Sequence, residues 1–267
     1  MRGDYDVYSP TLRAAVLAVA AFLLIPVIFI VIYAFNKTAY FSLPPQGLTL
    51  KWFANFFSND RFQQAIVTSL GMAAIVTPVS LIVGIPTAYA LVRGDFGGRA
   101  FLSAVVMSPL VVPGVITGIA FLIFLTAIGL GPGFAGLVIA MAAFALPFAV
   151  RALVATMSGI DPELENAARN LGATEWHVFR HIVLPQLRPA LLAGGTFVFV
   201  EAIDNFSISA FLTTRHSTTL PVEAYGYIRD FDDPTVAAMA AVLIVLTVVL
   251  VFLVGRIVGL DRMFRFE

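Results

Sequence analysis

Long apolar runs separated by shorter polar stretches dominate the chain. A transmembrane helix requires about 20 predominantly apolar residues, and six runs meet this length. They cover residues 12–35, 65–92, 101–126, 133–157, 190–213 and 235–258. The pattern therefore predicts an all-α membrane protein, in which six transmembrane helices form a single domain over residues 1–267.

The composition supports this class of protein. Hydrophobic residues make up 60% of the chain and charged residues only 12%, whereas roughly 25% of the residues are charged in soluble domains. The first run is longer than the apolar core of a signal peptide, about 7 to 15 residues, and no short cleavage site follows it, so we expect a span there. The chain has no cysteine, which excludes disulfides and thiolate metal sites.

Basic residues are distributed unevenly between the two sides of the predicted spans. Eleven arginines fall at the termini or in and near the second and fourth loops, against five basic residues in the other loops. Cytoplasmic loops of membrane proteins carry the excess of arginine and lysine. Both termini and the fourth loop, residues 158–189, are therefore predicted to be cytoplasmic.

The fourth loop is polar and contains signals for a short helix. Asp161 is a suitable N-cap, Pro162 suits the first helical position, and Gly172 is placed to end the helix. We therefore predict a helix from Pro162 to Leu171. At helical spacing, a narrow apolar stripe forms from Leu164, Ala167, Ala168 and Leu171.

A second short helix is predicted from Thr174, and it should stop before Pro185 because the residue before a proline disfavours helical geometry. Two short amphipathic helices at a kink suggest a docking element. The alternative is a surface loop that folds back on its own membrane domain.

The same loop resembles the EAA loop of permease subunits of bacterial ATP-binding-cassette (ABC) importers. That pattern is Glu-Ala-Ala, three residues, Gly, nine residues and Ile-x-Leu-Pro, and here its spacing is matched by Asn166-Ala167-Ala168, Gly172 and Ile182-Val183-Leu184-Pro185. In that family the loop inserts as a coupling helix into a groove on the ATPase subunit. Asn166 stands where the pattern has Glu, and Glu165 lies one position earlier, so the acidic contact is expected to be weakened or shifted. The resemblance implies ATPase coupling by Glu165, Asn166, Ala167, Ala168, Gly172, Ile182, Leu184 and Pro185.

Acidic residues occur within the fifth run, where Glu201 and Asp204 precede Asn205. On one helix these three residues share an arc of about 100°. A charge at the centre of a bilayer costs at least ~3 kcal/mol, so such a pair should face the helix bundle or an aqueous cavity. We expect Asp204, Glu201 and Asn205 to line a substrate pathway and attract a cation. The alternative is that the acids make structural hydrogen bonds between helices.

Aromatic residues cluster in the first external loop, residues 36–64, at Trp52, Phe53, Phe56 and Phe57. Trp and other aromatic rings collect at membrane–water boundaries. These residues therefore predict an amphipathic segment at that boundary, with a contact to an external receptor as the alternative.

Catalytic motifs are absent from the sequence. No P-loop pattern, HExxH or GxSxG occurs, and His177, His181 and His216 fall in predicted loops. We therefore expect no catalytic residue, no metal site and no cofactor in this chain, and ATP and Mg to be bound by a partner ATPase.

Residues 12–261 resemble the spermidine/putrescine-type permease group of ABC importers. The features that carry this resemblance are the six spans, Asn36, the stretch from Gly47 to Trp52, and Asp204. This resemblance implies a multi-pass protein of the bacterial inner membrane that moves a small cation, foremost putrescine or spermidine. The implied partners are a second homologous permease, two cytoplasmic ABC ATPases and an extracytoplasmic substrate-binding protein; no nucleic acid is expected. Similar permeases are associated with iron(III), thiamine, aminoethylphosphonate and opine-like solutes.

Two functions from other classes are alternatives. An ion-coupled secondary transporter would use Glu201 and Asp204 for protons or sodium, but the inverted repeat typical of such transporters is not visible in the sequence. An assembly protein without transport would use small residues at helix contacts, namely Gly114, Gly118, Gly194 and Gly195. The coupling-loop spacing argues against both.

Overall fold

The computed structural model describes residues 10–40, 42 and 44–258, and in this part the chain is helical with no β-strand. The long helices are α1 (Pro10–Ala34), α3 (Asp60–Arg93), α6 (Phe134–Ser158), α10 (Arg188–Asp204) and α13 (Thr235–Val258). Shorter helices are α2 (Lys51–Ser58), α4 (Arg99–Met107), η1 (Ser108–Leu110), α5 (Gly114–Ala127), α7 (Pro162–Asn170), α8 (Glu175–Val178), η2 (Phe179–Val183), α9 (Leu184–Gln186), α11 (Phe206–Leu212) and α12 (Leu220–Asp230). The predicted all-α class is confirmed.

Four of these helices, α1, α3, α6 and α13, are each long and apolar enough to cross a membrane. Two further spans result if each of two bent helix pairs counts as one span. These pairs are Arg99–Leu110 with Gly114–Ala127, bent by 106°, and Glu175–Gln186 with Arg188–Asp204, bent by 66°. The described residues thus hold four to six candidate spans, and the predicted number of six is reached with both bent pairs.

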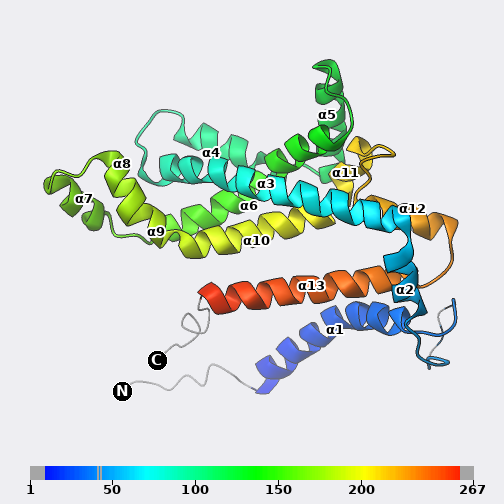
Figure 1. The fold of residues 1–267 in the computed structure, drawn as a ribbon. Coiled ribbons are helices and arrows are strands. Elements are labelled where there is room, and N and C mark those ends of the chain that lie inside the picture. The colour runs from blue at the N-terminus through cyan, green and yellow to red at the C-terminus, as the bar shows by residue number, and fades with distance from the viewer. Residues whose placement is uncertain (1–9, 41, 43, 259–267) are drawn as a thin grey trace. The chain divides into compact units, whose positions relative to one another are not determined.

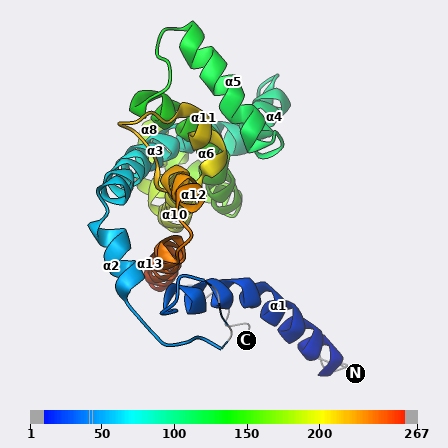
Figure 2. The same cartoon turned by 90° about the vertical axis from the view of Figure 1, so that its right-hand side faces the viewer.

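The third and fifth predicted spans are each broken into two helical parts. The run 101–126 breaks after η1, and the chain is extended at Pro113 before α5 begins at Gly114. Figure 2 shows α4 and α5 on either side of this break. Proline lacks the amide hydrogen of an α-helix and its ring clashes with the preceding turn, which explains the position of the break.

In the run 190–213, α10 ends at Asp204, and Asn205 adopts an extended conformation with ψ of 104°. The Asn205 side chain caps the next helix, α11, which begins at Phe206. Capping by Asn offers the backbone an alternative to a continuous helix. Periodicity alone does not reveal such a break.

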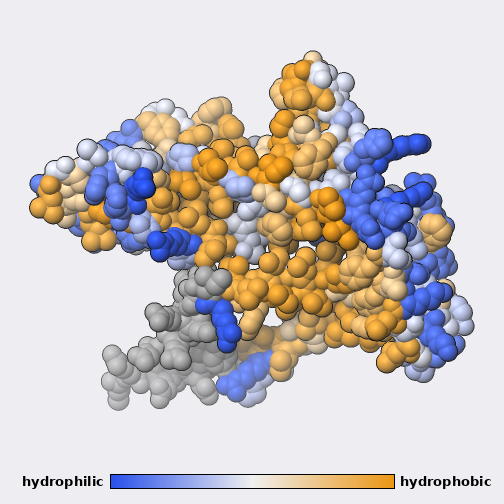
Figure 3. Space-filling view, viewed as in Figure 1, coloured by the Kyte–Doolittle hydropathy of each residue, from blue (hydrophilic) through white to orange (hydrophobic). Residues whose placement is uncertain are grey.

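The described chain divides into two compact units. One consists of the residues up to Asn59 together with Tyr227–Leu246, and the other consists of Asp60–Gly226 with the residues from Thr247. In the second unit, α3, α6 and α10 pack side by side (Figure 1). Hydrophobic residues cover most of the length of α3 and α10, whereas hydrophilic residues gather around α7 and α8 (Figure 3).

Glycines allow the helices of the second unit to approach closely. A Cβ added at Gly194 of α10 would lie 3.0 Å from the Cβ of Ala152 on α6. In α5, a Cβ at Gly118 would lie 2.8 Å from Phe211 Cδ2 and 3.0 Å from the Ser207 carbonyl oxygen, both on α11. Small residues at helix contacts are typical of membrane helix packing, and the prediction that these glycines lie at helix contacts is confirmed.

In the first unit, α2 packs on the end of α1 and the start of α13. Ala34, Trp52, Ala238 and Ala241 form its buried cluster. The Trp52 Nε1–H donates a hydrogen bond of 2.7 Å to the Asn36 carbonyl oxygen. Because Trp52 and Phe56 are buried while Phe57 is 54% exposed, the predicted amphipathic segment is confirmed as a helix.

Gly118, at the contact between α5 and α11, and Gly226, in open space on α12, should respond differently to replacement by alanine. Gly118→Ala places a methyl group against the α11 backbone, and overpacking of this kind typically destabilises by about 1–3 kcal/mol. Gly226→Ala adds a methyl group that meets no atom within 4 Å on α12, so it should be neutral or stabilising by up to about 1 kcal/mol.

Thermal unfolding of the detergent-solubilised protein should therefore show a lower midpoint for Gly118→Ala and an unchanged or higher one for Gly226→Ala. A midpoint at or above the parent value for Gly118→Ala would show that the contact is not tight.

Candidate functional site

The predicted helix in the fourth loop is present as α7, with the expected signals at both ends. The Asp161 carboxylate accepts a hydrogen bond of 3.0 Å from the Glu163 amide, and Pro162 occupies the first turn. At the other end Gly172 has φ of +86°, a backbone conformation that favours glycine. The bounds of the helix were therefore encoded locally.

Most of the apolar stripe of α7 is exposed. Leu164 is 49% exposed and Leu171 is 89% exposed. Asn166 and Ala167 are also exposed, and Ala168 is half-buried. The alternative of a loop that folds back on its own membrane domain therefore does not hold for Leu164 and Leu171, which stay exposed.

Glu165 points in the opposite direction, into the protein. Its side chain is 2% exposed and pairs with Arg93 at the end of α3, with 2.8 Å between Arg93 Nε and Glu165 Oε1. Arg93 also donates a hydrogen bond of 2.8 Å to the Ile160 carbonyl oxygen. Breaking a buried ion pair by removing one partner typically costs about 3–5 kcal/mol. A shift of the acidic ATPase contact from position 166 to Glu165 would require this pair to open.

Arg169 joins α7 to the next helix. Its guanidinium lies 3.3 Å from Glu165 Oε2 and donates two hydrogen bonds, of 2.6 and 3.0 Å, to the carboxylate of Glu175 on α8. These bonds lower the pKa of the Glu175 carboxyl below its usual value. Because Glu175 is largely exposed, this second pair contributes less to stability than the buried one.

The second predicted helix begins where expected but does not stop before Pro185. Thr174 caps α8 by accepting a hydrogen bond of 3.3 Å from the His177 amide. The chain then continues through the π-helix η2 into α9, and Pro185 lies in the first turn of α9. Proline inside a helical segment removes a backbone hydrogen bond and favours a bend, and the segment ending at Gln186 is bent by 66° against α10. His177 and His181 consequently lie in α8 and η2 rather than in loops.

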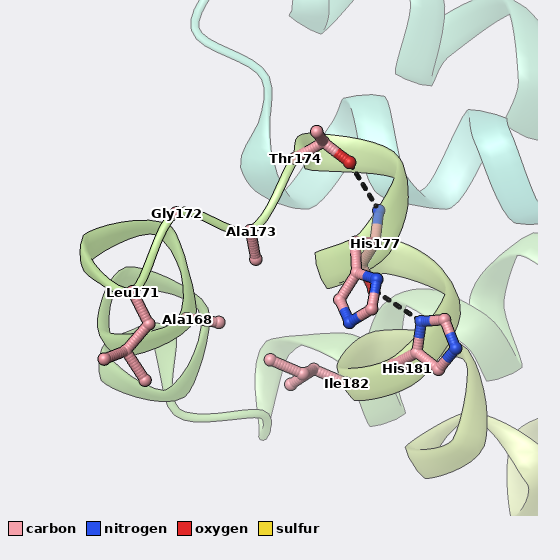
Figure 4. Close-up of a pocket in the computed structure, with 8 residues that line it drawn as sticks. All are labelled: Ala168, Leu171, Gly172, Ala173, Thr174, His177, His181 and Ile182. Atoms are coloured by element: carbon pink, nitrogen blue, oxygen red, sulfur yellow. Dashed lines mark hydrogen bonds between the residues drawn. The ribbon is translucent and has the colours of Figure 1, made fainter.

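An open pocket of about 470 Å³ lies between α7 and the α8–η2 segment. Figure 4 shows Ala168 and Leu171 on its α7 side, with His177, His181 and Ile182 on the other. The two imidazole rings stack with centroids 4.1 Å apart. The pocket thus brings together three of the eight predicted coupling residues, Ala168, Gly172 and Ile182.

The last two predicted coupling residues lie elsewhere. Leu184 lines a separate apolar groove of about 680 Å³ with Trp176 and the α3 residues Ile82 and Pro86. Pro185 is exposed.

The three predicted pathway residues meet at the break between α10 and α11. Asn205 Nδ2 donates a hydrogen bond of 3.0 Å to Glu201 Oε1, and Asn205 Oδ1 accepts one of 2.9 Å from the Ile208 amide. Glu201 is half-buried, whereas Asp204, the last residue of α10, is exposed. No ion pair in the described part of the chain involves either acid.

The break is electrostatically suited to cations. The C-terminal end of a helix carries partial negative charge, and here two carboxylates lie within its last turn. In membrane transporters, ends of broken helices of this kind coordinate cations. The alternative, that the acids make structural hydrogen bonds, holds in part for Glu201, which accepts a hydrogen bond from Asn205. It does not hold for Asp204, for which the described residues offer no side-chain partner.

Comparison with known proteins places these features in a family. A family model described as binding-protein-dependent transport system inner membrane component matches residues 77–259. The chain belongs to this family. It is a permease subunit of an ABC importer, as the coupling-loop resemblance predicted.

Two relatives support the resemblance to polyamine permeases. The spermidine/putrescine transport system permease protein PotC of Escherichia coli (strain K12) is 32% identical over 245 residues, which cover 92% of this permease and 92% of PotC. The putrescine transport system permease protein PotI of the same strain is 29% identical over 245 residues, which cover 89% of this permease and 87% of PotI.

The fold is that of ABC transporter permeases. A solved bacterial ABC transporter involved in the import of the acidic polysaccharide alginate contains a chain with a TM-score of 0.68 and 16% identity. The match covers 93% of this permease and 95% of that chain. At this identity the likeness shows the fold alone.

Arg93 was not among the residues singled out from the sequence. Its partner Glu165 is 72 residues away along the chain, and its position beside Gly94 in a basic turn gave no sign of the pair. A basic residue at the end of a predicted span, together with an acidic residue that a later helix would bury, is the sequence signal that could have predicted this ion pair.

Two substitutions of Asn205 separate its capping role from its bond to Glu201. Asn205→Ala removes the cap of α11 and should destabilise by about 1 kcal/mol, whereas Asn205→Ser keeps a capping oxygen and should lose much less. Both variants lose the amide group that donates to Glu201. Thermal unfolding in detergent should rank the midpoints as parent, Ser variant and Ala variant; equal midpoints for the last two would contradict the capping role.

Proposed function

We propose that this permease imports a small organic cation, a polyamine such as putrescine or spermidine, delivered by an extracytoplasmic binding protein. Residues 1–267 act as one transmembrane domain. It pairs with a second homologous permease and two cytoplasmic ATPase subunits, which bind ATP and Mg. The single observation that carries the substrate class is the pair of carboxylates, Glu201 and Asp204, at the end of α10.

The chemistry of a polyamine fits this break. Its ammonium groups are separated by apolar methylene spacers, and a carboxylate that is not neutralised by another side chain can attract them. Asp204 is exposed, while Asn205 holds Glu201 in place. The names of PotC and PotI, which include spermidine and putrescine, support the same class.

Coupling to ATP hydrolysis is assigned to α7. Its apolar stripe, with Leu171 89% exposed, docks on a cytoplasmic ATPase together with Asn166 and Ala167. The arginine distribution supports a cytoplasmic position for both termini and for this loop. Closure of the ATPases on ATP would then move α7. This movement would open the break between α10 and α11 first to one side of the membrane and then to the other.

Uptake into sealed vesicles tests the proposed substrate. Vesicles would contain the complex purified through this subunit, with binding protein and labelled putrescine or spermidine outside and ATP inside. We expect accumulation that depends on ATP. Uptake driven by an ion gradient without ATP would contradict the importer mechanism, and ATP hydrolysis without movement of either polyamine would contradict the substrate class alone.

The same assay tests the acids at the break. Asp204→Asn removes a carboxylate that attracts the cation and should lower uptake by about tenfold, equivalent to roughly 1.4 kcal/mol, and Glu201→Gln should have a smaller effect. Asp230→Asn, an exposed acid at the end of α12, is the matched control and should transport at the parent rate. Parent-level uptake by Asp204→Asn would refute the role of this carboxylate.

Docking of α7 is tested by association with the ATPase subunit. Burial of a leucine side chain contributes about 1.5–3 kcal/mol, so Leu171→Ser should weaken ATPase binding by about tenfold to hundredfold. Leu130→Ser, which alters a half-exposed leucine between α5 and α6, is the control. Co-purification measured at decreasing protein concentration should separate the two; equal retention would show that Leu171 lies outside the interface.

A further inference from the structure

Four charged side chains form a continuous chain of ion pairs from α3, through α7, to α8. Arg93 at the last position of α3 contacts Glu165 of α7 at 2.8 Å, Glu165 contacts Arg169 at 3.3 Å, and Arg169 contacts Glu175 of α8 at 2.6 Å. Glu165 is the most buried member, with 2% of its side chain exposed. Its two carboxylate oxygens are shared between the two arginines.

The base of the coupling loop is joined to α3 by apolar contacts, but α7 is not. At the base, Ile160 and Val183 belong to a buried cluster with Ala88 of α3, and the rings of Tyr89 and Phe179 meet edge to face at 5.7 Å. The packing neighbours of α7 are instead α8 and η2, and its leucines point outward. The Arg93–Glu165 pair is therefore a polar link between α7 and the long helix α3.

We propose that Arg93 and Glu165 are positioning residues that transmit displacement of α7 to α3 during the transport cycle. The inference rests on the proposed docking of α7 on an ATPase. Separating the two side chains would take from the buried Glu165 carboxylate its shorter ion pair and leave it only the 3.3 Å contact to Arg169, so the pair acts as a stiff connection. The 34 residues of α3 span about 50 Å, and α3 packs along α6 and α10. Motion applied at Arg93 is thereby carried through the helix bundle.

A role confined to stability makes a different prediction. If the pair only held the loop in its fold, its loss would reduce assembly of the complex without changing the response of an assembled one. If the pair transmits motion, assembled complexes should hydrolyse ATP with little response to the loaded binding protein.

The first test compares Arg93→Gln and Glu165→Gln with the controls Arg99→Gln and Asp95→Asn, which alter exposed residues close to Arg93 along the chain and outside α7. Each complex, in nanodiscs, is assayed for ATPase subunit content and for ATP hydrolysis with and without binding protein and putrescine. We expect normal subunit content and a stimulation ratio lowered by roughly tenfold, within the range of coupling between distant sites. The controls should keep the parent ratio, and a parent ratio in Arg93→Gln would overturn the proposal.

A distance measurement tests the link without a substrate. The chain has no cysteine, so spin labels at Val83→Cys on α3 and Asn170→Cys on α7 report one distance. With Arg93 present, the distance distribution should be the same with and without ATP in a complex whose ATPases do not hydrolyse it. With Arg93→Gln it should shift or broaden on ATP. A change on ATP with Arg93 present, or no effect of Arg93→Gln, would refute a stiff connection.

Arg93→Lys decides the case in which neither glutamine variant assembles. Lysine keeps the charge but cannot reproduce the forked contacts to Glu165 and to the Ile160 carbonyl oxygen. In an assembled lysine variant, binding protein and putrescine should stimulate ATP hydrolysis less than in the parent but still measurably. Stimulation equal to that of the parent would overturn the proposal. Parent complexes that show no ATP-dependent uptake would instead refute the proposed function, and the distance measurement would still test the pair.

Discussion

A helix that crosses a membrane must satisfy its backbone hydrogen bonds from within, because hydrocarbon offers no partner. The described chain obeys this constraint with helices, and polar side chains supply hydrogen bonds at the start of α7, α8 and α11. Asn205 accepts from the Ile208 amide at the start of α11, and Asp161 does the same for Glu163 at the start of α7. The positions of these caps determine where the chain can turn, and hence where its functional groups lie.

The acids of the permease experience two different environments. Glu165 is enclosed by two arginines and is removed from solvent, so its charge contributes to the rigidity of the loop. Asp204 has no such cation among the described residues and lies at an exposed helix end, so its charge remains available to a passing solute. The same chemical group thus makes a structural ion pair at Glu165 and, in the function we propose, recognises the substrate at Asp204.

Sequence reasoning succeeded where the signals are local and failed where they are not. Run lengths, the N-cap Asp161 and the terminating Gly172 lie within a few residues of the features they specify, and α7 and four of the six predicted spans appear as single helices. The break at Asn205 and the continuation through Pro185 depend on which of two local hydrogen-bond patterns the surrounding packing favours. The Arg93–Glu165 pair joins residues 72 positions apart, and the exposure of Leu164 and Leu171 depends on tertiary structure. No periodicity can supply either of these.

The exposed leucine of the coupling helix also bears on how the subunit is made. A leucine held in water forgoes about 1.5–3 kcal/mol of burial free energy, and Leu171 is 89% exposed while Leu164, on the same face, is 49% exposed. A newly inserted subunit therefore displays an adhesive patch of the kind that chaperones and proteases recognise on orphan proteins. Binding of the proposed ATPase partner would cover that patch, so exposure of Leu171 would then distinguish unassembled copies of the subunit from assembled ones.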